Sequence, residues 1–340
     1  MPVVLSVADA EVLATRALCA SRTRPDNALA TARALVRAEA DGQSGHGLSR
    51  VPSYSLQSQA GKVDGFSTPQ MQQVAAALLR INAAAGFAYP ALDLAINALP
   101  GLARQQGIAA AAIHHSHHFG VAGAHAERLA AQGVVALVLG NTPKAMNFFG
   151  GRQQRLGTNP LAFAAPLTAA GQPPLVIDLA MTVAARGKIV AAQQSGQSIP
   201  SDWATDADGK PTTDPEMALA GSLAPIGGAK GAALALMIEI LAGALTGSAF
   251  GWEASSMFDA AGGPPHVGQL LIAVDPGHAS GGAYPERMRE LLAAFAAEPA
   301  VRMPGMRRLE NRARAAADGL SIPDSLHQQI AKLAAATPSC

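Results

Sequence analysis

The spacing of apolar residues changes along the chain and predicts two kinds of structure. Over roughly the first 65 residues the apolar positions follow the three- and four-residue spacing of amphipathic helices. Ser6 and Asp9 resemble a capping box with a short acid, and Pro25 suits the first turn of a helix. These signals predict a small helical segment with helices over residues 6–19, 25–42 and 51–61.

From about Val74 onwards, strand-like and helix-like stretches alternate. Strands are predicted over residues 74–81, 108–113, 134–139, 161–165, 175–179 and 269–274, and helices over 89–106, 121–132 and 230–245. Residues 198–215 form the longest loop candidate, and residues 284–335 are predicted to be helical with one break at Pro304-Gly305. Alternation of this kind favours a doubly wound parallel sheet by default. However, no G-x-G-x-x-G follows any of these strands, which argues against a Rossmann nucleotide site.

Length and composition narrow the class of protein. A chain of 340 residues predicts two domains, and its 14% of charged residues give a net charge of only +1. No basic block is long enough to follow a phosphate backbone, so nucleic acid is not an expected partner. Residues 1–19 lack the basic start of a signal peptide, and no stretch predicts a membrane span. The two cysteines give no disulfide framework. The prediction is a cytoplasmic, soluble protein.

Four of the nine histidines lie close together, at the predicted junction between a strand and a helix. They are His114, His115, His117 and His118. Alternate strand residues face opposite sides and acidic partners are lacking nearby, so a metal site, which needs three or four convergent ligands, is disfavoured. Two readings stay open: histidines that are hydrogen-bonded for structural reasons, or at least one imidazole that transfers a proton or contacts a cofactor.

A second candidate is His46, which lies between Gly45 and Gly47 with Arg50 four residues later. One interpretation of a histidine between two glycines is a turn residue without a functional role. If a helix starts at Gly47, however, His46 and Arg50 face one pocket. A guanidinium binds a carboxylate through two hydrogen bonds, and an imidazole beside it could protonate the neighbouring group. The pair suggests a small carboxylate substrate.

Two further stretches could bind anions, although each signal is weak. Residues 227–231 place Lys230 and several glycines at a helix start, where backbone amides favour an anion. Arg307 and Arg308 follow a Pro-Gly turn and would suit the 2′-phosphate of NADP, although adjacent arginines are usually a solvated face.

Taken together, these stretches resemble the malate/L-lactate dehydrogenase type 2 family, near its sulfolactate dehydrogenase and Δ1-piperideine-2-carboxylate reductase members. The resemblance runs in order through nearly the whole chain. It rests on Gly45-His-Gly47 with Arg50 and Tyr54, on Ser116–Gly120, Gly157–Phe163, Asp178–Ala180 and Arg186–Lys188, and on Pro211–Pro215 and Gly227–Gly231.

The resemblance implies a fold that replaces the default topology. This is a non-Rossmann α/β fold with a mixed, largely antiparallel sheet in a central cofactor domain, residues 73–284. A helical domain built from both termini, residues 1–72 with 285–340, would carry the substrate and dimerisation surfaces. The resemblance also implies a homodimer and a reversible hydride transfer between NAD(P)H and the carbon next to a carboxylate.

The resemblance also implies roles for individual residues. His46 and His118 would be the catalytic candidates, and we favour His46 because it neighbours the carboxylate-binding Arg50. Substrate contacts would come from Arg50, Tyr54, Thr158, Arg186 and Gly187. Cofactor contacts would come from His118, Phe119, Gly120, Val121, Ala122, Thr142, Asp178, Leu179, Ala180, Lys230, Gly231, Arg302, Arg307 and Arg308. NADP(H) is favoured over NAD(H), and no metal is expected.

Two departures from the family pattern bear on the substrate. Imine-reducing members have a serine before the histidine and an aspartate in the segment resembling 186–188, whereas this chain has Gly45 and Lys188. The Arg186-Gly-Lys188 pattern resembles hydroxyacid dehydrogenases. We therefore favour a 2-hydroxy acid/2-oxo acid dehydrogenase of malate, lactate or sulfolactate type. The alternatives are a Δ1-piperideine-2-carboxylate/Δ1-pyrroline-2-carboxylate (cyclic imine) reductase and, less favoured, a non-catalytic cofactor-binding dimer.

Overall fold

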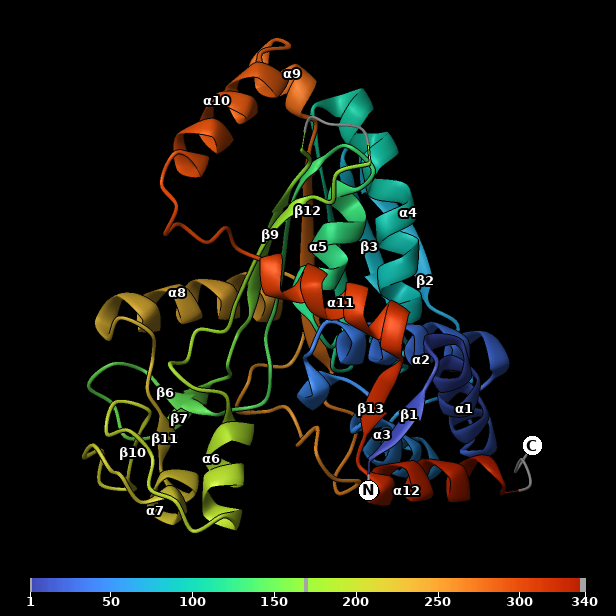
Figure 1. The fold of residues 1–340 in the computed structure, drawn as a ribbon, viewed down its shortest axis with the longest axis vertical. Helices are drawn as coiled ribbons and strands as arrows, with labels where there is room; N and C mark the ends of the chain where they lie inside the picture. The colour runs from blue at the N-terminus through green and yellow to red at the C-terminus, as the bar shows by residue number, and fades with distance from the viewer. Residues whose placement is uncertain (1, 168–170, 337–340) are drawn as a thin grey trace.

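The computed structural model describes residues 2–167 and 171–336 (Figure 1). Its helices are α1 Val7–Ala20, α2 Pro25–Ala40, η1 Ser44–His46, α3 Arg50–Gln59, α4 Ala88–Gln106, α5 Ala122–Ala130, α6 Arg186–Gln194, α7 Pro215–Ala220, α8 Ala229–Glu239, η2 Ile240–Ala244, α9 Pro276–Ser280, α10 Tyr284–Ala296, α11 Met306–Asp318 and α12 Asp324–Ala334. Its strands are β1 Val3–Leu5, β2 Gln70–Ala75, β3 Leu78–Asn82, β4 Ile108–Ser116, β5 Val135–Gly140, β6 Met146–Asn147, β7 Gln154–Leu156, β8 Leu161–Ala165, β9 Leu175–Leu179, β10 Ala204–Thr205, β11 Ser222–Leu223, β12 Val267–Val274 and β13 Leu320–Ile322.

A seven-stranded sheet in the order β2-β3-β4-β12-β5-β8-β9 forms the centre of the molecule. Neighbouring strands are antiparallel except for β3 and β4, which are parallel. The default prediction of a doubly wound parallel sheet is therefore wrong, and the mixed, largely antiparallel sheet is confirmed. The reason is β12, which comes from late in the chain and pairs antiparallel with both β4 and β5.

Successive residues of β12 pack into two different apolar clusters, one on each face of the sheet. Leu271 and Ala273 join the larger apolar cluster, which includes residues of α4 and α5. Leu270 joins a second cluster with Ala235 and Ile238 of α8. Because successive strand residues face opposite sides, the sheet is covered by α4 and α5 on one face and by α8 with η2 on the other (Figure 1).

Both ends of the described chain meet in one helical layer. β1 pairs antiparallel with β13, and α1 packs against α12 (Figure 1). This agrees with the expectation that both termini build the helical part, although the exact division at residues 72 and 285 stays a prediction. No helix in the described ranges is long and apolar enough to cross a membrane.

Local geometry corrects several predicted elements. Residues 74–81 are not one strand but parts of the β2–β3 hairpin. The C-terminal segment has a second break, because Gly319 at φ +84° ends α11 and β13 follows before Pro323. The loop candidate 198–215 contains β10, which belongs to a small sheet in the order β10-β11-β6-β7. The predicted helix 230–245 is α8 continued by the π-helical turn η2.

Candidate active site

The predicted site segments leave the central sheet at one edge. The end of β4 at Ser116 lies opposite Val267, and the end of β5 at Gly140 lies opposite Gln269. The start of β8 at Leu161 pairs with Leu139 and with Leu179, near the end of β9. Register therefore brings the turns that carry residues 117–122, 141–142, 157–159 and 178–180 to the same edge, although they are far apart in the sequence.

His46 and His118 lie against each other at this edge. Their ring centroids are 5.1 Å apart and their planes differ by 18°, so the rings are stacked. His46 ends the short turn η1, which follows α2, whereas His118 follows β4. The turn at His46 is tight, because a Cβ on Gly47 would lie 2.2 Å from the Oε2 atom of Glu39. The two histidines that sequence analysis left as rival candidates thus belong to one site.

Tyr54 fixes the ring of His118 through a hydrogen bond to Nδ1. The hydroxyl of Tyr54 is 2.5 Å from Nδ1 of His118, and the Tyr54 ring also packs edge-on against His117. Tyr54 is fully buried against His118, and its contact with substrate stays a prediction. Because Nδ1 is hydrogen-bonded, Nε2 of His118 is the nitrogen left to face a reacting group.

His117 is held by a separate network. Its Nε2 donates to Oε1 of Gln57 at 2.7 Å, and its carbonyl oxygen accepts from Nε2 of Gln269 at 3.1 Å. This arrangement fits the structural reading of His117. The described residues contain no group of three or more His, Cys, Asp or Glu side chains that could hold a metal ion.

Burial and positive charge keep the histidine pair neutral. Burial, followed by the charge of Arg50, lowers the pKa of His46 to about 4. Burial, Arg50 and the neighbouring histidines hold the pKa of His118 well below its usual range. At neutral pH both imidazoles can therefore accept a proton, and either would be a strong acid once protonated.

Arg50 offers a guanidinium for an anion next to the histidines. Its Nε donates to the carbonyl of Gly45 at 2.8 Å, and its Cζ lies 4.6 Å from the ring centroid of Phe258. Among the described residues, no carboxylate pairs with it. The remaining edge of the guanidinium can bind a carboxylate with two parallel hydrogen bonds.

The cofactor candidates 118–122 run into the amino end of α5. The N-cap residue Val121 makes no side-chain cap, but the Gly123 amide in the first turn donates to Oδ2 of Asp178 at 3.0 Å. A Cβ on Gly123 would lie 2.8 Å from the same oxygen, so only glycine lets the carboxylate approach. Burial outweighs this amide and the charge of Arg308, and it raises the pKa of Asp178.

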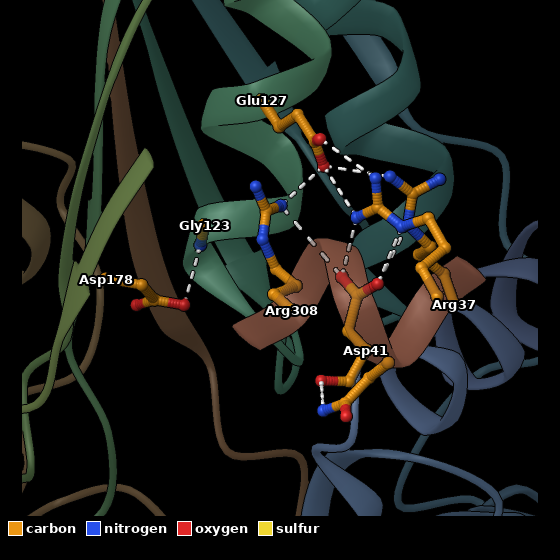
Figure 2. Close-up of polar contacts among 8 residues, drawn as sticks. Arg37, Asp41, Gly123, Glu127, Asp178 and Arg308 are labelled. Carbon is orange, nitrogen blue, oxygen red and sulfur yellow. Dashed lines mark hydrogen bonds and ion pairs between the residues drawn. The ribbon is translucent and has the colours of Figure 1, made fainter. Parts of the chain in front are cut away.

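The third predicted cofactor segment, residues 302–308, lies near the other two, residues 118–122 and 178–180, at Arg308. Arg308 is 8% exposed, and its Nη1 donates to Oε2 of Glu127 at 2.5 Å (Figure 2). Its Nε and Nη2 have no hydrogen-bond partner within the described ranges. Figure 2 shows its side chain between Glu127 on one side and the Gly123–Asp178 pair on the other. Arg302 and Arg307, in contrast, are exposed.

Arg308 belongs to an ion-pair cluster that sequence analysis did not find. Arg37 and Asp41 of the first helical segment, Glu127 of α5, and Arg312 of α11 complete it. Within the cluster the three arginines outnumber the two carboxylates, and Arg308 is the arginine that lies toward Asp178 (Figure 2). The spacing of Arg37 and Asp41, four apart on a helix, was the one visible signal.

Of the remaining site candidates, Thr142 and Thr158 lie in turns at the same sheet edge, whereas the other four lie on helices. Thr142 and Thr158 contact each other, since the Thr158 amide donates to Oγ1 of Thr142 at 2.9 Å. Arg186 and Gly187 begin α6, and Lys230 and Gly231 lie in the first turn of α8. Within the described ranges, no hydrogen bond or ion pair joins these six residues to the histidine pair. Their assigned roles stay predictions.

Buried Glu239 fixes the two turns that carry Thr142 and Thr158. Its carboxylate accepts from Nδ2 of Asn141 at 2.9 Å and from Nδ2 of Asn159 at 2.8 Å. The Gly251 amide donates to it at 2.7 Å. These hydrogen bonds satisfy a carboxylate that is 2% exposed. Nothing in the sequence pattern singled out these residues.

Known proteins agree with this chemistry. The chain is 46% identical over 326 residues to the (2R)-3-sulfolactate dehydrogenase (NADP(+)) of Chromohalobacter salexigens, covering 96% of each chain. It is 43% identical over 301 residues to the Δ1-pyrroline-2-carboxylate/Δ1-piperideine-2-carboxylate reductase of Pseudomonas putida, covering 87% of this chain and 86% of the relative. The crystal structure of Δ1-piperideine-2-carboxylate reductase from Pseudomonas syringae superposes with a TM-score of 0.91 at 38% identity, covering 97% of this chain and 99% of that chain.

The fold, the site and these relatives define the class: the protein is an NAD(P)-dependent oxidoreductase. The malate/L-lactate dehydrogenase family model matches residues 5–331, and the chain therefore belongs to that family.

The histidine pair gives a test that separates its two members. We expect His46→Ala to lower kcat about 100-fold or more, because general acid–base catalysis contributes that much, while the affinity for NADPH is unchanged. Steady-state kinetics and fluorescence titration with NADPH measure the two quantities. His278→Ala, at an exposed position outside the site, is the control. If His118→Ala is inactive and His46→Ala is not, the two roles are reversed.

Proposed function

We propose that the protein is an NADP(H)-dependent dehydrogenase that interconverts small 2-hydroxy acids and 2-oxo acids. The observation that carries this proposal is the stacked, neutral His46–His118 pair beside a guanidinium, Arg50, that no carboxylate among the described residues pairs with. A carboxylate on Arg50 would place the adjacent carbon and its oxygen next to the imidazoles. The 46% identity to an NADP-dependent sulfolactate dehydrogenase supports the same substrate class.

The residues at the end of α5 fit a dinucleotide. The first-turn amides of α5 other than that of Gly123, which donates to Asp178, favour phosphate oxygens, and the carboxylate of Asp178 can accept hydrogen bonds from a ribose. The two free nitrogens of Arg308 add donors for an anion. When bound, the nicotinamide would accept or supply the hydride.

The protein's own side chains then provide binding and proton transfer. Arg50 would hold the carboxylate, and in the oxidation direction a neutral imidazole of the pair would take the proton of the substrate hydroxyl. In the reduction direction the same imidazole, once protonated, would return it to the carbonyl oxygen. A carboxylate bound to Arg50 would offset part of the positive charge that lowers the pKa of His46, so binding would make proton uptake easier.

Cyclic imine reduction is the alternative, because a C=N bond next to a carboxylate fits the same pair of groups. The relative from Pseudomonas putida supports it. Gly45 and Lys188 favour the hydroxy acid, because they stand where imine-reducing members have a serine and an aspartate. The ammonium of Lys188 lies near the Trp203 ring, with 5.7 Å between Nζ and the ring centroid. A non-catalytic cofactor-binding dimer is less favoured.

The deciding experiment is a substrate panel with both cofactors, followed by NAD(P)H absorbance. We expect turnover of at least one 2-oxo acid, with NADPH preferred. Turnover of piperideine-2-carboxylate with none of the oxo acids would instead establish the imine reductase. Tight NADPH binding without turnover of any acid or imine would establish the non-catalytic alternative.

The proposed preference for NADPH over NADH depends on the exposed Arg307 as well as on Arg308. We expect Arg307→Ala to raise the KM for NADPH about tenfold and leave the KM for NADH unchanged, because only NADPH carries the 2′-phosphate. Arg308→Ala is less informative, since it would also remove the buried ion pair between Arg308 and Glu127. Arg314→Ala, also exposed on α11, is the matched control. Equal effects of Arg307→Ala on both cofactors would contradict the 2′-phosphate role.

We also propose a homodimer in the cytoplasm. α8 and the start of η2 expose several large apolar side chains: Leu234, Leu236, Met237 and Ile240. On α10 only Met288 is buried, while Leu291 and Phe295 are more than 40% exposed. Exposed apolar surface of this kind marks a protein interface. Sedimentation equilibrium should give twice the chain mass of 34.5 kDa, and a monomer at micromolar concentration would contradict the proposal.

A further inference from the structure

A segment from late in the chain, residues 257–261, lies against the carboxylate-binding arginine. The ring of Phe258 lies over the guanidinium of Arg50, with 4.6 Å between Cζ and the ring centroid. Phe258 is nevertheless 62% exposed, which is unusual for a large apolar side chain that serves only packing. Its ring covers one face of Arg50, and the Gly45 carbonyl already accepts from Nε. A ligand carboxylate can therefore approach only the open edge of the guanidinium.

A buried lysine holds this segment in place. Lys62 is 2% exposed, and its Nζ donates to the carbonyl of Asp259 at 3.1 Å and to that of Ala261 at 2.6 Å. The same Nζ lies 3.6 Å from Oδ1 of Asp259. A buried ammonium is costly unless it is fully hydrogen-bonded, and all these partners belong to the segment that carries Phe258. Lys62 thus fixes the backbone on the carboxyl side of the phenylalanine.

A second clamp joins the same segment to the histidine loop. Nε2 of Gln57 donates to the carbonyl of Met257 at 3.2 Å, while its Oε1 accepts from Nε2 of His117 at 2.7 Å. His117 is the neighbour of His118, and Gln57 is buried. One amide side chain therefore sets the position of the Phe258 segment relative to the loop that carries His118, one member of the histidine pair.

We propose that Phe258 is a specificity-determining residue of the substrate pocket. Its ring fixes the plane of the Arg50 guanidinium, and its exposed part forms the wall against which the substrate packs beyond the reacting carbon. Lys62 and Gln57 are positioning residues that act through Phe258. The inference rests on the proposed function, because it takes the carboxylate on Arg50 to belong to the substrate. It adds a pocket wall that the histidine and arginine motifs do not contain.

The test compares Phe258→Leu, which keeps apolar bulk but removes the ring, with Phe66→Leu. Phe66 is also an exposed phenylalanine, at 51%, but it lies in the turn after Asp64. For the best 2-oxo acid, we expect Phe258→Leu to raise KM about tenfold, as loss of a partly desolvated cation–π contact implies. Its kcat and its KM for NADPH should stay within about twofold of wild type, because the histidines and the cofactor site are untouched.

Lys62→Met tests the positioning role, with Lys62→Arg as the conservative variant. We expect Lys62→Met to reproduce the rise in KM for the acid, and Lys62→Arg to restore part of it. Thermal unfolding shows whether each variant is folded. Should Lys62→Met not fold, Phe258→Leu still decides the question, since an exposed ring can be removed without opening the core.

A binding measurement separates failure of this inference from failure of the proposed function. Oxamate, a planar analogue of 2-oxo acids, is titrated into the NADPH complex and followed by NADPH fluorescence, which needs no turnover. Weaker binding of oxamate to Phe258→Leu than to Phe66→Leu supports the inference. Equal binding, or equal KM values for the acid, overturns it even if wild type is an active dehydrogenase. A wild-type protein that neither binds oxamate nor turns over an acid contradicts both proposals.

Discussion

The pairing of β12 between β4 and β5 is the constraint on which the rest of the structure depends. Because β12 runs antiparallel to both, β4 and β5 point the same way and end at one edge of the sheet. β8 starts and β9 ends at that same edge, by the register of their pairing. The turns with His118, Thr142, Thr158 and Asp178 therefore meet without any of them being close in the sequence. A strand contributed after residue 266 thus determines the geometry of a site whose residues come mostly before it.

Two buried polar clusters hold this edge in place for different reasons. Glu239 satisfies Asn141, Asn159 and a backbone amide, and Oδ1 of Asn141 accepts from the Gly268 amide in β12. The cluster around Glu127 joins the first helical segment and α11 to α5 through arginines. Removing one member of such a network leaves buried groups unpaired, which costs more than the lost contact itself. The first cluster fixes the Thr142 and Thr158 turns, and the second reaches the proposed dinucleotide site through Arg308 (Figure 2).

The chemistry of the site follows from two poorly solvated imidazoles that lie next to the positive charge of Arg50. Loss of solvent contact and the neighbouring guanidinium of Arg50 lower the pKa values of half-buried His46 and buried His118, so both imidazoles are neutral at neutral pH. The same guanidinium, without a carboxylate partner among the described residues, attracts an anionic substrate. Binding and proton transfer are thereby linked through Arg50. The aromatic ring of Phe258 and the buried ammonium of Lys62 extend this arrangement to a segment some 200 residues away in the sequence.

The sequence by itself determined the family and the helical start of the chain, and it supplied the candidate residues of the site. Short motifs such as Gly45-His46-Gly47 with Arg50 have local causes, so they can be read without the fold. The tertiary structure alone decided that His46 stacks on His118, that Tyr54 is buried behind His118, and that Arg308 is paired with Glu127. The apolar pattern left the strand directions open, because apolar runs are alike in parallel and antiparallel strands; the antiparallel sheet was expected only from the family resemblance. Phe258, Gln57 and Glu239 carried no local signal, since their roles arise from contacts between segments that only strand register and packing bring together.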